Sequence, residues 1–236
     1  MEMEKKKNKD FKKLITGIGV LFLYLIGSAY TYEFIELFGI NYNSLNLVAK
    51  QIYLILYEIS LTLIIIYIYR KDFIPNFKNF KKNFSKYLNK YFKYWFIMYF
   101  IMIISNLIIT LFTTTDISKN QQSIIEALTE APFYTIIITM FIAPIIEELV
   151  FRLSFKKMFA HTNFLFIFFS GIFFGMIHVI SSLDNLVNLL FIIPYSIPGF
   201  MFAYLYTKSE NIFVPIGLHF FHNTLMMLLQ ILLILI

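Results

Sequence analysis

The chain has 236 residues, of which 59% are hydrophobic and 14% are charged, whereas a soluble globular domain is typically about 45–50% apolar and about 25% charged. This composition excludes an ordinary soluble domain and predicts an all-α fold, a polytopic bundle of transmembrane helices. The net charge of +6 comes from Lys and Arg that cluster between apolar runs, which is typical of cytoplasmic loops and not of a nucleic-acid-binding surface, and the lack of cysteine excludes a thiol nucleophile and any disulfide.

Apolar runs long enough to cross a bilayer, about 18 residues or more with few charges, cover most of the chain. We therefore expect one integral membrane domain, residues 1–236, with about seven spans. These spans are expected at Leu14–Tyr32, Leu47–Tyr69, Tyr94–Phe112, Pro132–Arg152, Asn163–Ile180, Asn185–Tyr206 and Ile212–Ile236. Because the cationic segments fall on the side of the N-terminus, we expect a multi-pass protein of the cell membrane whose N-terminus is cytoplasmic.

The segment between the second and third expected spans, Arg70–Trp95, carries many lysines and aromatic residues. This mixture is typical of a helix that lies at the surface of an anionic bilayer. We therefore expect an interfacial helix in a cytoplasmic loop, with the lipid bilayer as its partner. A segment that docks a substrate is the alternative.

Three charges stand together in the fourth expected span: Glu147, Glu148 and Arg152. An ionised side chain near the middle of a bilayer costs about 3 kcal/mol on insertion scales, so these charges need a reason. Glu148 and Arg152 are four residues apart and share a helical face, so we expect them to pair. Glu147 lies about 140° away from Arg152 around the helix and stays free to accept a proton. The alternative is a structural ion pair with a glutamate near the interface.

The fifth expected span contains the sequence GIFFGMIHVI, residues 171–180. Gly171 and Gly175 form a small-xxx-small pair, which lets two helices approach closely. His178 shares a helical face with Gly171 and Phe174, so we expect it to face the interior of the bundle. It can serve chemistry there, or it can simply bond to a neighbouring helix.

The seventh expected span contains GLHFFHNTL, residues 217–225. His219 and Asn223 are four residues apart and face the same way, while His222 lies near that face and competes with His219 for a role. A polar network between helices is the alternative. Glu58, in the second span, is a further costly charge to which the sequence assigns no partner.

Together, the three sites supply the parts for hydrolysis of a peptide bond. Glu147, with His178, can position and deprotonate a water as general base. His219 and Asn223 can donate hydrogen bonds to the developing oxyanion. The alternative chemistry is a metal site, in which His178, His219 and a glutamate bind zinc and leave one position open for water. The sequence contains neither H-E-x-x-H nor G-x-S-x-G, which argues against a zincin helix and a serine nucleophile elbow.

Three motifs occur in order: E-E-x-x-x-R at 147–152, F-x-x-x-H at 174–178 and H-x-x-x-N at 219–223. In this respect the chain resembles the CAAX protease and bacteriocin-processing (CPBP) family, also called the Abi family, over about Pro132 to Leu225. The resemblance implies an all-helical intramembrane endopeptidase. It implies a catalytic set of Glu147, Glu148, Arg152, His178, His219 and Asn223. It also favours His219 over His222 as the second histidine, because only His219 has the motif spacing.

The resemblance leaves the cofactor open, because family members are described both as metalloproteases, with zinc possible, and as glutamate proteases without a metal. The expected substrate is a peptide precursor, such as a pheromone or bacteriocin precursor, or a membrane-associated protein. One alternative is a catalytically inactive membrane protein, such as a bacteriocin-immunity or regulatory factor that only binds. Another is an ion or proton transporter that uses Glu58, Glu147 and Glu148.

One expectation conflicts with the others. In the expected topology, His178 lies toward the outer end of its span and His219 toward the inner end of its own. With a rise of about 1.5 Å per residue, straight spans with these ends would hold the two imidazoles at different depths. A shared site therefore requires different span ends or broken helices.

Overall fold

The computed structural model describes residues 2–113, 117–180 and 187–235, without the side chains of Glu2 and Leu235. The first two residues of the expected sixth span, Asn185 and Leu186, and the last residue of the seventh, Ile236, lie outside the described residues. Over the described ranges the chain forms helices and no strand. The predicted all-α class is therefore confirmed, and the chain is a polytopic helix bundle.

Five helical segments in the described ranges are long and apolar enough to cross a membrane. They belong to α1 (Glu2–Ala29), α2 (Leu47–Ile68), α4 (Phe84–Phe112), η6 with α10 (Asn188–Phe191 and Ile192–Ser209) and α11 (Phe213–Leu235). A shorter apolar helix, α9, covers Asn163–Val179. The short helices η1 (Phe34–Phe38), η2 (Tyr42–Ser44) and α5 (Lys119–Glu130) lie in the connections.

The expected fourth span is one helical run that changes its winding. It consists of α6 (Pro132–Ile137), η3 (Ile138–Ile142), α7 (Ala143–Glu148), η4 (Leu149–Ser154) and α8 (Phe155–Met158), in which η3 and η4 are π-helical. A π turn bonds i to i+5 and widens the helix, and such turns are frequent at functional sites. The two glutamates of the first motif lie between the two π turns.

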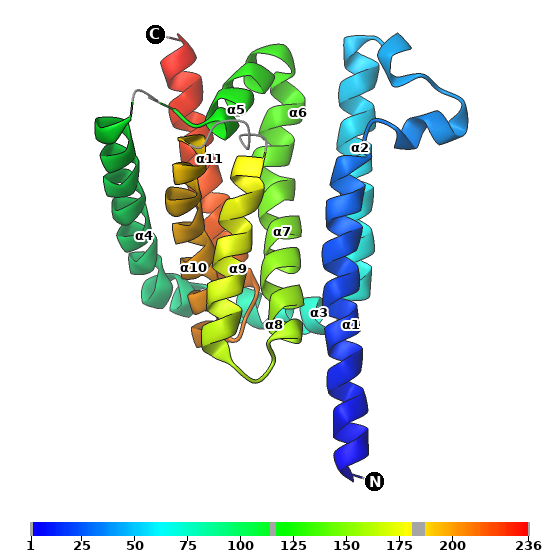
Figure 1. Ribbon diagram of the computed structural model, residues 1–236, viewed down its shortest axis with the longest axis vertical. Helices are drawn as coiled ribbons and strands as arrows, with labels where there is room; N and C mark the ends of the chain where they lie inside the picture. Colours follow the sequence, from blue (N-terminus) through cyan, green and yellow to red (C-terminus); the bar gives the residue numbers. More distant parts are fainter. Residues whose placement is uncertain (1, 114–116, 181–186, 236) are drawn as a thin grey trace.

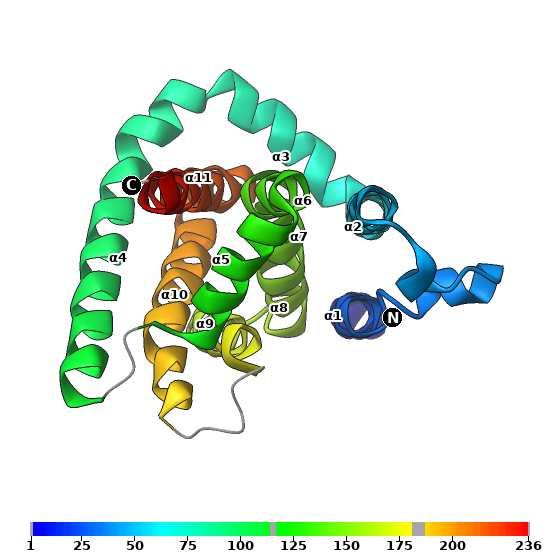
Figure 2. The ribbon, with the colours of Figure 1, turned by 90° about the horizontal axis from the view of Figure 1, so that it is seen from above.

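The run α6–α8 occupies the centre of the molecule. The helices α1 and α2 lie on one side of it and α9, α10 and α11 on the other, as Figures 1 and 2 show. On the first side, α1 packs against η4 and α8, and α2 packs against α6 and η3. On the second side, α11 packs along η3 and α7, and α4 covers α10 and α11. The N- and C-termini lie at opposite ends of the bundle (Figure 1).

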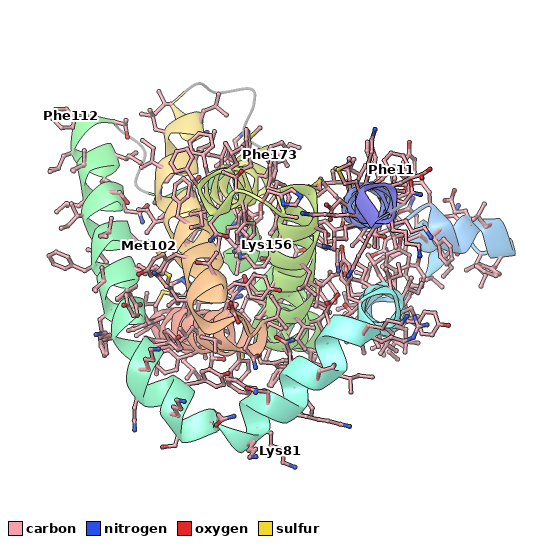
Figure 3. All side chains as sticks on the ribbon, turned by 90° about the horizontal axis from the view of Figure 1, so that it is seen from below. Phe11, Lys81, Met102, Phe112, Lys156 and Phe173 are labelled. Carbon is pink, nitrogen blue, oxygen red and sulfur yellow. The ribbon has the colours of Figure 1, made fainter. Side chains whose placement is uncertain are left out.

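The connection between α2 and α4 begins with helix α3 (Arg70–Lys82), which runs across one end of the bundle (Figures 1 and 2). Its apolar side packs on α11, where Phe73 and Phe77 contact the ring of Phe213. Figure 3 shows the opposite side, where Lys81 points away from the helices. A helix is thus confirmed in this segment, and its position at the bilayer surface stays a prediction.

Helices α9 and α10 approach each other closely at two glycines of α9, Gly171 and Gly175. A Cβ atom added to Gly175 would lie 2.8 Å from the carbonyl oxygen of Ile192 and would overlap Ser196. A Cβ atom on Gly171 would likewise overlap the ring of Phe200. The predicted close approach at this glycine pair is confirmed, and it brings the helix of His178 against α10.

We predict that Gly175→Ala lowers the free energy of unfolding by about 1–3 kcal/mol, since the new methyl group forces α9 and α10 apart. The matched control is Gly19→Ala on α1, where a Cβ atom meets nothing within 4 Å. That control is expected to be neutral or slightly stabilising, because alanine favours a helix over glycine. Thermal unfolding in detergent micelles compares the two, and a Gly175→Ala protein as stable as Gly19→Ala would contradict this packing.

Candidate active site

A buried ion pair lies at the centre of the site. Arg152 donates from Nε to Oε2 of Glu148 at 2.8 Å and from NH2 to Oε1 at 3.1 Å. Both side chains are fully buried. The predicted pair therefore forms in its bidentate geometry, which suits a planar guanidinium and a carboxylate.

The remaining surface of the guanidinium also has partners. NH1 of Arg152 donates to Oγ of Ser170 at 2.7 Å, and this hydroxyl donates to the carbonyl of Phe151 at 2.6 Å. The rings of Phe174 and Phe202 lie 4.9 and 5.9 Å from the guanidinium carbon. Arg152 thus ties η4 to α9 and α10. A carboxylate, a hydroxyl and two aromatic rings together compensate its charge.

Glu148 has a second partner, His219 of α11. Nδ1 of His219 lies 3.0 Å from Oε1 of Glu148, within hydrogen-bonding distance. An ionised carboxylate only accepts hydrogen bonds, so Nδ1 carries the proton in this contact. The imidazole stacks on Phe202, with ring centroids 5.1 Å apart, and 96% of His219 is buried. Glu148 therefore fixes the orientation of His219, a link that the sequence analysis did not predict.

Glu147 differs from Glu148 in having a free oxygen. No group in the described part of the chain hydrogen bonds to its buried Oε2. The nearest cationic candidate is Nε2 of His219 at 3.8 Å, which is too long for a hydrogen bond. An unpaired carboxylate oxygen among apolar helices is costly, so this atom needs a ligand such as water or a substrate.

A cavity of about 230 Å³ lies against Glu147. Its walls also include His178, His219 and Asn223, so it brings together the three motifs. The two predicted histidines therefore reach one site, although straight expected spans would have separated them. The ring of Phe174 contacts both imidazoles, with centroids 4.7 Å from His178 and 5.7 Å from His219.

His178 is held by its own helix. Its Nδ1 lies 2.7 Å from the carbonyl oxygen of Phe174, which can only accept, so Nδ1 carries a proton. In the neutral imidazole the other nitrogen, Nε2, is then an acceptor. The ring stacks on Tyr195 of α10, with centroids 4.9 Å apart, which orients His178 at the cavity wall.

Asn223 is positioned by the first π turn. In η3 the N–H of Ala143 bonds to the carbonyl of Ile138, one residue earlier than in an α-helix. The carbonyl of Thr139 thereby loses its usual donor, and the next candidate, Pro144, has no N–H. Nδ2 of Asn223 supplies the missing donor at 2.9 Å. One hydrogen of this amide is used in the contact, and its second hydrogen remains for another acceptor.

Two further residues singled out in the sequence take different places. His222 also lines the cavity, but it packs beside Trp95 and Tyr99 of α4, and its buried Nδ1 has no hydrogen-bond partner among the described groups. Glu58 of α2 does not line the cavity.

The described residues do not fit a metal ion. They contain no group of three or more His, Asp and Glu side chains arranged to hold one. The hydrogen bonds that His219 and His178 make through Nδ1 leave Nε2 of each ring available, so it is the arrangement of the side chains, and not these bonds, that argues against a metal. We therefore route no chemical step through zinc.

The fold and the site define a polytopic membrane protein with a glutamate–histidine site enclosed among its helices. Residues 129–225 match the family model described as Type II CAAX prenyl endopeptidase Rce1-like. This segment contains all three motifs and coincides closely with the predicted range. Over this segment, the chain is similar to the CAAX protease and bacteriocin-processing family.

A curated relative supports this similarity. The chain is 33% identical over 116 residues to a Bacillus subtilis (strain 168) protein named "Putative membrane peptidase YdiL". The similarity covers 48% of this chain and 44% of the relative, so it spans less than half the length of that protein. No solved structure matches the chain significantly.

We predict that Arg152→Ala destabilises the protein by about 3–5 kcal/mol, because Glu148 then remains buried without its cation. The double variant Glu148→Gln with Arg152→Gln is expected to recover part of this loss, since no net charge stays buried. Thermal unfolding in detergent micelles measures both. If the double variant is no more stable than Arg152→Ala, the two side chains do not stabilise the fold as a pair.

Proposed function

We propose that the chain is an intramembrane endopeptidase in which Glu147 activates a water for attack on a peptide bond. One observation carries the proposal: Glu147 presents a buried, unpaired oxygen to a cavity that two histidines and an amide also line. A general base must reach the proton that it removes, and a water in this cavity meets that condition. The similarity to this family and to a peptidase relative supports a membrane protease in general.

His178 orients the water. Because Nδ1 of His178 donates to its own helix, Nε2 can accept a hydrogen bond from the water in the cavity. Glu147 then takes one proton as the water oxygen attacks the carbonyl carbon of the substrate. The negative charge moves to the carbonyl oxygen, which becomes the oxyanion.

His219 and Asn223 stabilise that oxyanion. With Nδ1 of His219 donating to Glu148, a second proton on Nε2 makes the ring an imidazolium, which also donates into the cavity. Asn223 offers the amide hydrogen that its contact with Thr139 leaves unused. Donors that are already oriented stabilise developing charge without reorganisation, most effectively where water is excluded.

The intermediate then collapses. The C–N bond breaks as the leaving nitrogen takes from Glu147 the proton that came from water, and the products are a carboxylic acid and an amine. In this scheme Glu148 and Arg152 touch no reacting atom. They are positioning residues, since Arg152 holds Glu148 and Glu148 holds His219.

The substrate class follows from the surroundings of the site. The cavity lies among membrane-spanning helices, which suits a peptide precursor or a segment of a membrane-associated protein better than a folded soluble protein. Bacteriocin and pheromone precursors meet this description. The proposed orientation, with the N-terminus and the lysine-rich helix α3 in the cytoplasm, follows the distribution of Lys and Arg.

Glu147→Gln tests the general base. We predict that this change abolishes hydrolysis, while the protein still inserts and unfolds at the wild-type temperature, because glutamine has the same shape but cannot take the proton. The matched control is Glu58→Gln, a second intramembrane carboxylate that does not line the cavity, and it keeps its activity. Turnover of a fluorogenic peptide library by purified protein is the measurement, with a chelator arm. Full activity of Glu147→Gln sinks the mechanism, and a wild type that binds peptides without cleaving them favours the inactive binding protein.

A comparison of alanine variants of the two histidines of α11 distinguishes an oxyanion role from a role in packing. We predict that His219→Ala slows turnover roughly 100- to 1000-fold, as the loss of one oxyanion donor typically does. Substrate binding changes little, because the donor acts on charge that appears only in the transition state. His222→Ala is expected to keep far more activity, since His222 contacts neither glutamate in the described set of hydrogen bonds and ion pairs. The reverse order of the two variants would overturn the assignment.

A further inference from the structure

The end of the cavity away from Glu147 contains a pair of carboxamides. Nε2 of Gln121, at the start of α5, donates to Oε1 of Gln230 on α11 at 3.2 Å, and both side chains line the cavity. Asn120 lines it beside them and donates to the hydroxyl of Tyr195 at 3.2 Å. This end of the cavity is therefore polar, although α10 and α11, which form part of it, are apolar.

The glutamine pair leaves two complementary groups for a ligand. Its hydrogen bond uses the nitrogen of one amide and the oxygen of the other, so one carbonyl acceptor and one NH₂ donor remain. A peptide main chain presents the matching groups, an N–H donor and a C=O acceptor. If the pair reverses its direction, one acceptor and one donor still remain, so the complementarity does not depend on which nitrogen donates.

The pair lies in line with the catalytic residues on α11. His219, Asn223, Met226, Met227 and Gln230 all line the cavity, at spacings of three, four and seven residues that keep them on one helical face. Seven residues of helix separate Asn223 from Gln230, which is roughly 10 Å. An extended peptide advances roughly 3.3 Å per residue, so about three substrate residues cover this distance.

The wall between the two polar ends is rich in methionine. Met226 and Met227 come from α11, and Met102 comes from α4, where Figure 3 shows it on the side that faces the neighbouring helices. Methionine is flexible and polarizable, and it adapts to apolar groups of different shape. An apolar side chain of a bound peptide therefore finds a permissive surface there.

We propose that Gln121 and Gln230 form a subsite that binds the main chain of the substrate about three residues from the bond that is cut, while the methionine wall takes an apolar side chain in between. The inference rests on the proposed peptidase function and adds its substrate class: an extended, apolar peptide segment recognised partly through its backbone. The competing explanation is that the glutamine pair only ties α5 to α11.

The test measures peptide binding on the inactive Glu147→Gln background. The probes are short library peptides and analogues in which one amide N–H at a time is replaced by an ester oxygen. One ester position is expected to weaken binding roughly two- to tenfold, as the loss of one hydrogen bond does. The same ester has no further effect once Gln230→Leu or Gln121→Leu removes its partner.

Gln122→Leu is the matched control, because Gln122 lies on the same helix but is exposed and bonds to Glu126. It keeps the sensitivity to the ester. If the glutamine pair only ties α5 to α11, Gln230→Leu lowers the stability of the protein, but the ester weakens peptide binding to this variant as much as it weakens binding to the control. This result overturns the proposal. So does a failure of every peptide to bind. Peptides that bind with the predicted ester sensitivity but are not cleaved by the wild type overturn the peptidase function and leave the subsite standing.

Discussion

The buried pair of Glu148 and Arg152 is the interaction on which the rest of the site depends. Two charges among apolar helices are tolerated only when each has enough partners, and removing one partner leaves the other uncompensated. Glu148 meets this demand with Arg152 and His219, and Arg152 meets it with Glu148 and Ser170. Satisfying the pair therefore draws η4, α9 and α11 together. It also occupies Glu148 fully, so that Glu147 remains the carboxylate with a free oxygen.

The backbone imposes a second constraint. A polar main-chain group cannot face lipid unpaired, so a disturbed helix needs help from its neighbours. The π turn before Pro144 leaves the carbonyl of Thr139 without its usual donor, and Asn223 supplies one. The same contact holds α11 against the central run and sets the depth of His219. The π turn η3 in the central run thus positions residues of α11. Asn223, a proposed oxyanion donor, is itself held by the carbonyl that this turn leaves free.

Local patterns predicted what depends on nearby residues. The helical fold, the pairing of Glu148 with Arg152 and the close approach at Gly175 follow from composition and from spacings of four residues, so periodicity was enough. The bonds from His219 to Glu148 and from Asn223 to Thr139 join residues about 70 to 85 positions apart, and the second bond pairs a carbonyl freed by a π turn that periodicity does not reveal. For the same reason the straight-span topology placed the two histidines at different depths, and it gave no sign of the glutamine pair.

The central claim is that neighbouring glutamates have separate roles: Glu148 holds His219 and Glu147 stays free. The chain has only four histidines, so nitrogen NMR of histidine-labelled protein resolves each ring. The account predicts that the hydrogen-bonded Nδ1–H signal of His219 persists in Glu147→Gln and shifts strongly in Glu148→Gln. A signal that responds to Glu147→Gln and ignores Glu148→Gln would contradict it.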